Sequence, residues 1–308
     1  MLSELQSIAR IVTPYALDIY DRSAVNALLP QLTQVVPNPT RAKSVTMEWT
    51  SIFANLRKWV GERVVEKSFA ERVTIVGEKY EMTDSFDRYD IERGTALANV
   101  EQKSAALAEG FAAGKAMIAV RVLRENRLTY DGQNFFDTDH VHPDGRSYSN
   151  VVDVTRSVAA APDVLEARAE LTAALLQLMS IRLWGDSIAS AENVRQNLIV
   201  ITKSNAVFSA YELLRTEPSF GADPNTWKGT FSLWLDYNPA AGTENKVDVV
   251  MALPSGPRPV LWMPTREPSG IEFDTTQAFK IGQIFMGMDG EFGVEAGFPQ
   301  CAVRIDPD

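Results

Sequence analysis

The chain is poor in the residues that most often bind metals or form disulfides. Its 308 residues include one cysteine, Cys301, and two histidines, His140 and His142. A single cysteine cannot close an internal disulfide or supply a cysteine-ligated zinc site. We therefore expect a fold that is held together by its apolar core, which a chain of this length can build without crosslinks.

Long apolar runs are missing as well. The most apolar segment, NLIVIT at 197–202, is far shorter than the roughly 20 residues that cross a bilayer. The first residues, MLSELQSIARIV, carry Glu4 and Arg10 where a secretory signal would be apolar. We expect a soluble chain that is made in the cytoplasm and binds no membrane.

Basic residues are fewer than acidic residues. The chain has 30 lysines and arginines against 40 aspartates and glutamates, which gives a formal net charge of -10. The acidic residues are spread along the sequence, and such a surface opposes broad contact with a phosphate backbone. Specific binding of nucleic acid is therefore not expected.

The usual motifs of nucleotide binding and hydrolysis are also absent. The stretch GFAAGK at Gly110–Lys115 has only three residues between its glycines, and Ala116 stands where a phosphate-binding loop needs Ser or Thr. Neither a dinucleotide fingerprint nor a G-x-S-x-G elbow occurs. Gly110 and Gly114 instead predict that another backbone passes close to a helix.

One short stretch, DGQNFFDTDHVH, gathers candidate ligands. Asp137, Asp139, His140 and His142 offer donors that suit zinc, manganese or iron. In an extended segment, however, the two carboxylates and the two imidazoles point to opposite faces. The Asp-Gly turns and hydrogen-bonding side chains favour a turn-rich loop anchored by Phe135 and Phe136. A metal-dependent hydrolase using the four ligands is the alternative hypothesis.

Periodicity predicts an α+β fold. Apolar and charged residues alternate between Trp49 and Phe86, which predicts a long two-stranded hairpin. An isolated ribbon of this kind is marginally stable, so contacts with a partner are expected along it. From Asp90 to Leu123 the apolar spacing is helical and predicts one long helix, capped by Asp87 or Asp90. Helices and strands then alternate to the C-terminus.

Three stretches carry a resemblance to a known family. They are TRAKSVTMEWTSIFANLRKWVGERVVEKSF, YDGQNFFDTDH and FMGMDGEFGVEAGFPQCAVRI. In order and spacing they resemble the major head subunit family of phage Mu and Mu-like prophages, over about residues 40 to 308. The most specific parts are the runs Trp59–Arg63 and Tyr130–Phe136.

The resemblance implies a capsid protein of the Hong Kong 97 fold. Its expected parts are an N-terminal arm at 1–46, an E-loop hairpin at 47–88, a peripheral domain with a spine helix at 89–150, an axial domain at 151–255, and a segment at 256–308 that returns to the peripheral domain. The expected family-motif loop consists of Tyr130, Asp131, Gly132, Phe135 and Phe136.

The same resemblance implies a structural role. The chain is expected to assemble with itself into hexamers and pentamers that tile an icosahedral shell around phage DNA, in the virion, without enzymatic activity or a cofactor. Portal, scaffold, protease and decoration proteins are the other partners that it implies. The candidate inter-subunit contacts are Trp59, Glu62, Arg63, Glu66 and Arg72.

Overall fold

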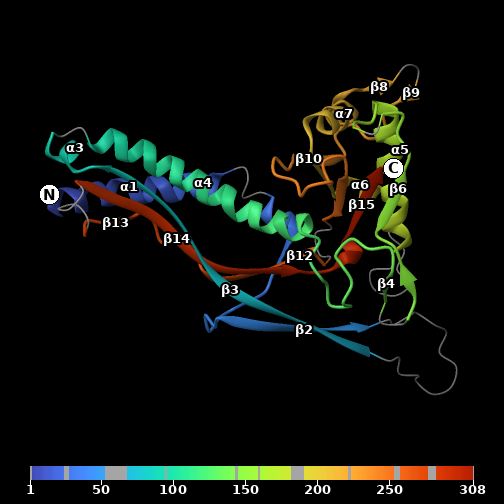
Figure 1. Cartoon of the computed structure of the whole chain (residues 1–308), viewed down its shortest axis with the longest axis horizontal. Coiled ribbons are helices and arrows are strands. Elements are labelled where there is room, and N and C mark those ends of the chain that lie inside the picture. The colour runs from blue at the N-terminus through green and yellow to red at the C-terminus, as the bar shows by residue number, and fades with distance from the viewer. Residues whose placement is uncertain are drawn as a thin grey trace. The chain divides into compact units, whose positions relative to one another are not determined.

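The computed structural model describes residues 2–23, 28–52, 68–93, 96–142, 145–158, 160–181, 191–220, 223–252, 257–276 and 282–307. Helices and strands follow one another in a mixed order along the chain (Figure 1). The chain divides into two compact units. Unit 1 contains Met1–Val45, Thr74–Ala119 and Trp262–Val294, and unit 2 contains Thr46–Val73, Val120–Leu261 and Glu295–Asp308. No helix among the described residues is long and apolar enough to span a bilayer.

A six-stranded sheet lies mainly in unit 1, although its residues 46–52, 68–73, 260–261 and 295–296 belong to unit 2. Its strands run in the order β1-β12-β14-β3-β2, with β13 beside β14. The strands are β1 (Thr33–Val35), β2 (Ser44–Ile52), β3 (Ser68–Asp87), β12 (Val260–Arg266), β13 (Glu272–Asp274) and β14 (Gln283–Ala296). The helices are α1 (Leu2–Arg22), α2 (Leu29–Leu32), α3 (Arg88–Glu92) and α4 (Ala96–Arg124), whose last residues belong to unit 2.

The two strands predicted between Trp49 and Phe86 are present as β2 and β3, which are neighbours in the sheet. They do not form an isolated ribbon throughout, because Gly77–Asp87 of β3 pairs antiparallel with Gln283–Gly293 of β14. Part of the predicted hairpin is therefore fixed by a third strand. Residues 53–67 lie outside the described part of the chain.

The single helix predicted from Asp90 to Leu123 is wrong at its start. The structure has a short helix, α3, and a long one, α4, that begins at Ala96. Asp87 caps the short helix α3 and not the long helix for which it was predicted, since its carboxylate accepts a hydrogen bond from the backbone N–H of Tyr89 at 2.9 Å. One face of α4 packs on the sheet, and Lys103 pairs there with Asp84 of β3 at 3.0 Å.

The glycines of α4 do not meet another backbone, so that prediction is wrong. A Cβ at Gly110 would lie 2.8 Å from the sulfur of Met82, which is a side-chain contact, and a Cβ at Gly114 would meet nothing within 4 Å. Close approach does occur on β14. There a Cβ at Gly293 would lie 2.7 Å from the carbonyl oxygen of Val76, and the ring of Phe111 lies 3.3 Å from the Cβ position of Gly290.

The expected arm has no separate core, but its helix packs within unit 1. Val12 and Ala16 of α1 are fully buried. Tyr20 donates a hydrogen bond to Glu267 at 2.9 Å, and the ammonium group of Lys115 donates to the same carboxylate at 2.7 Å. Because the ammonium group also lies 5.3 Å from the centre of the Trp262 ring, it joins α1, α4 and β12 through charge and aromatic contact.

The second unit contains a five-stranded mixed sheet in the order β10-β7-β11-β15-β6. The outer pairs are parallel, and β11 is antiparallel to both β7 and β15. The strands of this sheet are β6 (Val151–Val154), β7 (Leu198–Thr202), β10 (Phe231–Leu235), β11 (Val247–Met251) and β15 (Ala302–Pro307). Two small hairpins pair β4 (His140–Val141) with β5 (Ser147–Tyr148) and β8 (Ser219–Phe220) with β9 (Asp223–Pro224).

Two helices cover one face of this sheet. They are α5 (Val164–Ser180) and α7 (Asn205–Thr216), with the short α6 (Ala191–Gln196) between them in sequence. Asp163 and Glu166 form a capping box that starts α5, and the Ser204 hydroxyl accepts from Val207 N–H to start α7. The side chains of this face form the core of unit 2 with those of α5 and α7. Successive side chains along a strand point to opposite faces of the sheet, so Asp248 and Arg304 point to the face away from α5 and α7.

A pair of glycine substitutions tests these packing differences. Gly114→Ala should raise the free energy of unfolding by about 0.5–1 kcal/mol, because the added methyl group enters open space and alanine is the better helix former. Gly293→Ala should lower it by about 1–3 kcal/mol, because its methyl group would overlap a backbone oxygen of β3. Urea unfolding of the purified protein, followed by circular dichroism, measures both values. Equal effects of the two substitutions would contradict the packing described for β14.

Candidate functional site

The predicted motif loop lies in unit 2, just after α4, and it is rich in turns. The carboxylate of Asp131 accepts hydrogen bonds from the Thr129 hydroxyl and from the backbone N–H of Gln133, the latter at 3.1 Å. Gly132 has a φ of +81°, which suits glycine and closes the turn with a 3.0 Å bond from its N–H to the Thr129 carbonyl. The Asp-Gly pair therefore makes the turn that its sequence predicts.

Two phenylalanines hold this loop in the interior. Phe135 and Phe136 are 0% and 5% exposed, and their rings pack edge to face with their centres 4.9 Å apart. The guanidinium group of Arg304 lies 3.9 Å from the centre of the Phe136 ring. Asn126 pairs with the backbone of Phe136 in both directions, accepting from its N–H at 2.6 Å and donating to its carbonyl at 3.2 Å. The loop is thus fixed by both side-chain packing and backbone hydrogen bonds.

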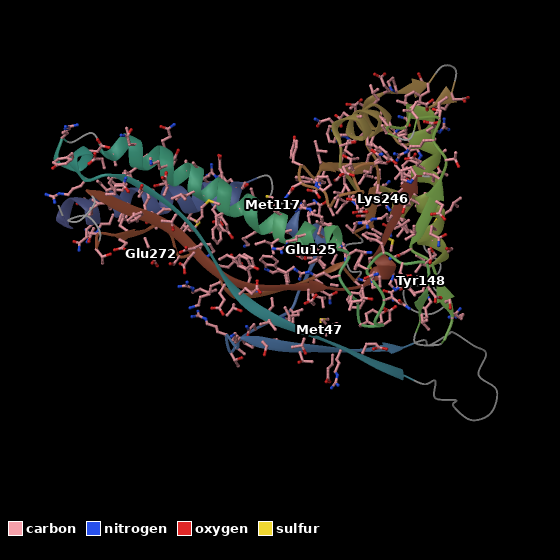
Figure 2. All side chains as sticks on the ribbon, in the orientation of Figure 1. Met47, Met117, Glu125, Tyr148, Lys246 and Glu272 are labelled. Carbon is pink, nitrogen blue, oxygen red and sulfur yellow. The ribbon has the colours of Figure 1, made fainter. Side chains whose placement is uncertain are left out.

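His140 is fully buried, and both of its ring nitrogens have protein partners. Nδ1 lies 2.7 Å from the Asp131 carboxylate, and Nε2 lies 3.2 Å from the carbonyl oxygen of Phe135. The ring of Tyr148, whose position Figure 2 labels, stacks on His140 at 5.0 Å and lies 4.3 Å from the ring of His142. The histidines therefore pack into the loop instead of facing an open site.

The structure does not bring the four candidate ligands together. Asp137 accepts a hydrogen bond from the backbone N–H of Asp139 at 3.1 Å, and Asp139 itself is exposed. Within the described ranges, no group of three or more His, Cys, Asp and Glu side chains is arranged to hold a metal ion. The carboxylate that pairs with His140 is Asp131, which lies outside the D-x-D-H-x-H pattern. The metal-dependent hydrolase is accordingly not favoured.

Asp131 depends on these partners for its charge. Burial by itself raises the pKa of a carboxyl group, but the hydrogen bonds from His140 and Thr129 outweigh that effect and lower the pKa of Asp131 to about 2. The neighbouring Tyr130 and Tyr148 have pKa values raised above the ordinary value, mainly by burial. The loop therefore combines an ionised carboxylate with neutral phenols.

A buried ionic cluster lies on the same side of the sheet as the loop. Arg304 of β15 binds Asp248 of β11 through two hydrogen bonds of 2.7 and 3.1 Å, and Lys203 lies 2.8 Å from the same carboxylate. Arg304 also donates to the carbonyl oxygen of Leu123 at the end of α4. Burial raises the pKa of Asp248, but the two cations outweigh burial and lower it, which keeps the group ionised.

Sequence reasoning missed this cluster. The signal was a charged residue within each of two apolar runs, DVVM and CAVRI, because a charged residue inside a buried strand needs a partner of opposite charge. The pairing of Asp248 with Arg304 is set by strand register, which places the two residues directly opposite each other. No local pattern specifies that register.

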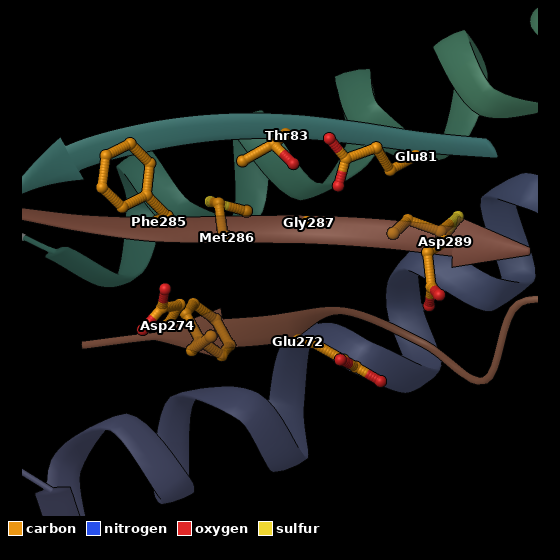
Figure 3. Close-up of a pocket in the computed structure, with 10 residues that line it drawn as sticks. Glu81, Thr83, Glu272, Asp274, Phe285, Met286, Gly287 and Asp289 are labelled. Atoms are coloured by element: carbon orange, nitrogen blue, oxygen red, sulfur yellow. The ribbon is translucent and has the colours of Figure 1, made fainter. Parts of the chain in front are cut away.

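In unit 1, the outer face of the sheet has an open hollow of about 480 Å³. Figure 3 shows it over Gly287 of β14, with Thr83 and Glu81 on one side and Glu272 on the other. Gly287 is one of the residues that line the hollow, and Asp274 and Asp289 add to its acidic rim. Arg266 pairs with Asp289, which offsets part of that charge.

The predicted contact residues are only partly described. Trp59, Glu62, Arg63 and Glu66 lie outside the described residues. Arg72 lies in β3 and is exposed. Their role in subunit contact stays a prediction.

The Asp131–His140 pair predicts a specific dependence of stability on pH. Because the pKa of Asp131 is lowered on folding, its contribution is complete above the ordinary carboxyl pKa near 4 and is lost as the pH falls toward 2. Asp131→Asn should lower the free energy of unfolding by about 1–3 kcal/mol at pH 7, and its deficit relative to the parent should narrow between pH 4 and pH 2.

Urea titrations at several pH values measure this deficit. Asp139→Asn is the matched control, since Asp139 is exposed and should change stability by less than about 0.5 kcal/mol. A deficit of Asp131→Asn that stays constant down to pH 2 would show that the ionised carboxylate does not stabilise the loop.

Comparison with known proteins supports the resemblance. Residues 20–166 match the family described as Mu-like prophage major head subunit gpT. The major capsid protein of Escherichia phage Mu is 28% identical over 133 residues, which are 42% of this chain and 42% of that protein. The match therefore spans less than half of the Mu protein. The family match begins before residue 40, and the closing stretch FMGMDGEFGVEAGFPQCAVRI lies outside it.

Solved structures match over nearly the whole chain. The match to the procapsid of bacteriophage JBD30 covers 98% of this chain and 74% of the JBD30 chain, at 18% identity and a TM-score of 0.53. The match to the capsid of the empty GTA particle covers 91% of this chain and 89% of the GTA chain, at 11% identity and a TM-score of 0.55. The match to the virus-like particle from Pyrococcus furiosus covers 96% of this chain and 98% of the particle's chain, at 12% identity and a TM-score of 0.55. Residues 20–166 therefore resemble the Mu-like prophage major head subunit family, and the chain has the α+β, Hong Kong 97-type fold of phage capsid proteins.

Proposed function

We propose that this chain is a major capsid protein that assembles with itself into hexamers and pentamers, which form the icosahedral head around phage DNA. The observation that carries the proposal is the match of residues 20–166 to the Mu-like major head subunit family. A capsid-type fold over the rest of the chain supports it. The protein would then act in the virion, after assembly in the host cytoplasm.

The parts of the fold are assigned to parts of a capsid subunit within this proposal. Residues 1–46 form the N-terminal arm, and 47–88 form the E-loop hairpin. Residues 89–150 hold the spine helix α4 of the peripheral domain, 151–255 form the axial domain, and 256–308 return to the peripheral domain. Within that last segment, β15 is a strand of the five-stranded sheet of unit 2, so its end pairs with strands of the proposed axial domain. The long helix α4 and the long strand β3 support these assignments.

Subunit contacts are assigned first to the hairpin. Trp59, Glu62, Arg63, Glu66 and Arg72 combine an aromatic side chain with charges of both signs, which suits a polar contact that must choose one orientation. Each such contact contributes modestly to the free energy of association. Closed symmetry repeats it many times, so that the shell is stable although single contacts are weak.

The packaged DNA is held without specific contacts in this proposal. The net charge of -10 gives the subunit little attraction for a phosphate backbone. Portal, scaffold, protease and decoration proteins are proposed as the other partners in assembly. No catalytic residue or cofactor is assigned, and the interior position of His140 supports a structural role for the motif loop.

Electron microscopy of the purified protein tests the assembly proposal. The protein, alone or produced with a scaffold protein, should form closed shells of uniform diameter. Analytical ultracentrifugation measures the remaining free subunit. A protein that stays a folded monomer under every assembly condition would contradict the proposed function.

The hairpin contact predicts an effect of charge order. Exchanging the two charges, with Glu62→Arg and Arg63→Glu together, keeps the net charge but reverses the local pattern, so shell yield should fall at least tenfold. The matched control is Glu62→Asp with Arg63→Lys, which keeps each sign and should preserve assembly. Circular dichroism should show folded subunits in both cases. Normal shells from the exchanged variant would mean that these charges make no subunit contact.

A further inference from the structure

Unit 1 has another hollow, which α1, α2, β1, α4 and β12 line together. We call it the α1–β1 hollow. Its volume is about 600 Å³, which lies within the range of about 300–1,000 Å³ that is usual for ligand-binding pockets. All of its lining residues belong to unit 1. The apolar ones are Leu17, Leu29, Pro30, Val35, Trp262 and Pro268.

Three polar side chains of this lining are more than nine-tenths buried. Tyr20, Thr33 and Lys115 are each 7% exposed. The ammonium group of Lys115 donates to the Tyr20 hydroxyl and, at 2.7 Å, to the carboxylate of Glu267, which balances its charge. An ammonium group has three N–H donors, and the described residues provide acceptors for two of them. The third donor of Lys115 can therefore bond a carbonyl oxygen that enters the hollow.

The strand β1 is an edge of the six-stranded sheet, and it borders the α1–β1 hollow through Thr33 and Val35. The backbone N–H of Val36 donates to the carbonyl oxygen of Trp262 in β12 at 2.7 Å. Backbone groups of neighbouring residues in a strand point to opposite sides, so those of Val35 point away from β12. The Val35 side chain is 59% exposed. A strand edge of this kind can pair with an added strand from another protein.

The charges around the hollow favour a basic ligand. Its lining has the two carboxylates of Asp21 and Glu267 and the one ammonium group of Lys115, which gives a net charge of -1. Lys115 pairs with Glu267, whereas Asp21 is exposed and has no ion pair with a basic side chain in the described part of the chain. A neutral apolar group therefore suits the interior of the hollow, and a cation suits the rim at Asp21.

We propose that the α1–β1 hollow binds an extended segment of a different protein, in which aliphatic residues alternate with polar ones and at least one residue is Lys or Arg. The segment adds to β1 as a further strand, and one aliphatic side chain enters the hollow. A backbone carbonyl of the segment accepts from Lys115, and its basic side chain pairs with Asp21. This interaction is separate from the proposed self-assembly and does not depend on it.

An array of synthetic octapeptides tests the chemistry of the segment. Threonine fills every second position, the positions between are all Val, all Leu or all Ser, and each peptide ends in either Lys or Glu. The purified protein, carrying a fluorescent label, should bind the Val or Leu peptides that end in Lys roughly tenfold more strongly than the Ser peptides or the peptides that end in Glu. Binding to no member of the array would overturn the proposal, and so would equal binding to the Lys and Glu peptides.

Substitutions at Val35 test the place of binding. Val35→Pro removes the outward N–H and should weaken binding of the best peptide roughly tenfold, while the fold is kept because an edge strand tolerates proline. Val35→Thr keeps the N–H and is the matched control, with unchanged affinity expected. Fluorescence anisotropy measures the affinities, and circular dichroism checks the fold. If the proline variant does not fold, Val35→Trp fills the hollow from its exposed side instead, and unchanged peptide affinity of that variant would overturn the proposal.

The same peptide distinguishes a second copy of this chain as the occupant. Its affinity is measured for the lightest species of the purified protein and for the largest assembled species, separated by size. Equal affinity supports a different protein as the partner. Binding that is lost on assembly would show that another copy covers the hollow, which would overturn the proposal. The proposed self-assembly is judged by electron microscopy alone, so either idea can fail without the other.

Discussion

The ion pair between Arg304 and Asp248 is the interaction on which unit 2 most depends. Arg304 binds Asp248 through two hydrogen bonds, donates to the carbonyl oxygen of Leu123 and lies on the ring of Phe136. It thereby connects the last strand, a central strand, the end of the long helix and the motif loop. Because all these groups are buried, removing one partner would leave a charge without compensation, which is far more costly than losing a surface pair.

This arrangement explains why the motif loop is held in the interior. The loop has to fit between a turn at Asp131 and a guanidinium group that stands on Phe136. His140 contributes by filling the interior and by bonding Asp131 and a backbone carbonyl. Residues that look like ligands in the sequence are thus used to hold a loop in one conformation.

Much of the local structure follows from the sequence. The two strands between Trp49 and Phe86, the cap at Ser204 and the turn at Gly132 were all predictable, because each depends on residues near one another in the chain. The end of α3 at Glu92 was not, since the apolar spacing does not mark it. Local periodicity does not record where one helix ends and the next begins.

The candidate site was less predictable than the fold. Phe135 and Phe136 were expected to anchor the loop, but the partner of His140 was not identified, because Asp131 reaches it only after the chain turns. Arg304 and Asp248 are 56 residues apart and meet through strand register. Contacts of this range depend on how the whole sheet is assembled, and a single sequence contains no local record of them.

Gly290 restricts the register in which β14 pairs with β3. The ring of Phe111 lies against this glycine, and the residues on either side are Asp289 and Glu291. If β14 slipped by one residue along β3, a carboxylate would be placed beneath that ring, where no water can hydrate it. The lack of a side chain at Gly290 therefore disfavours the neighbouring alignments and favours the observed one, which has eleven residue pairs from Gln283↔Asp87 to Gly293↔Gly77.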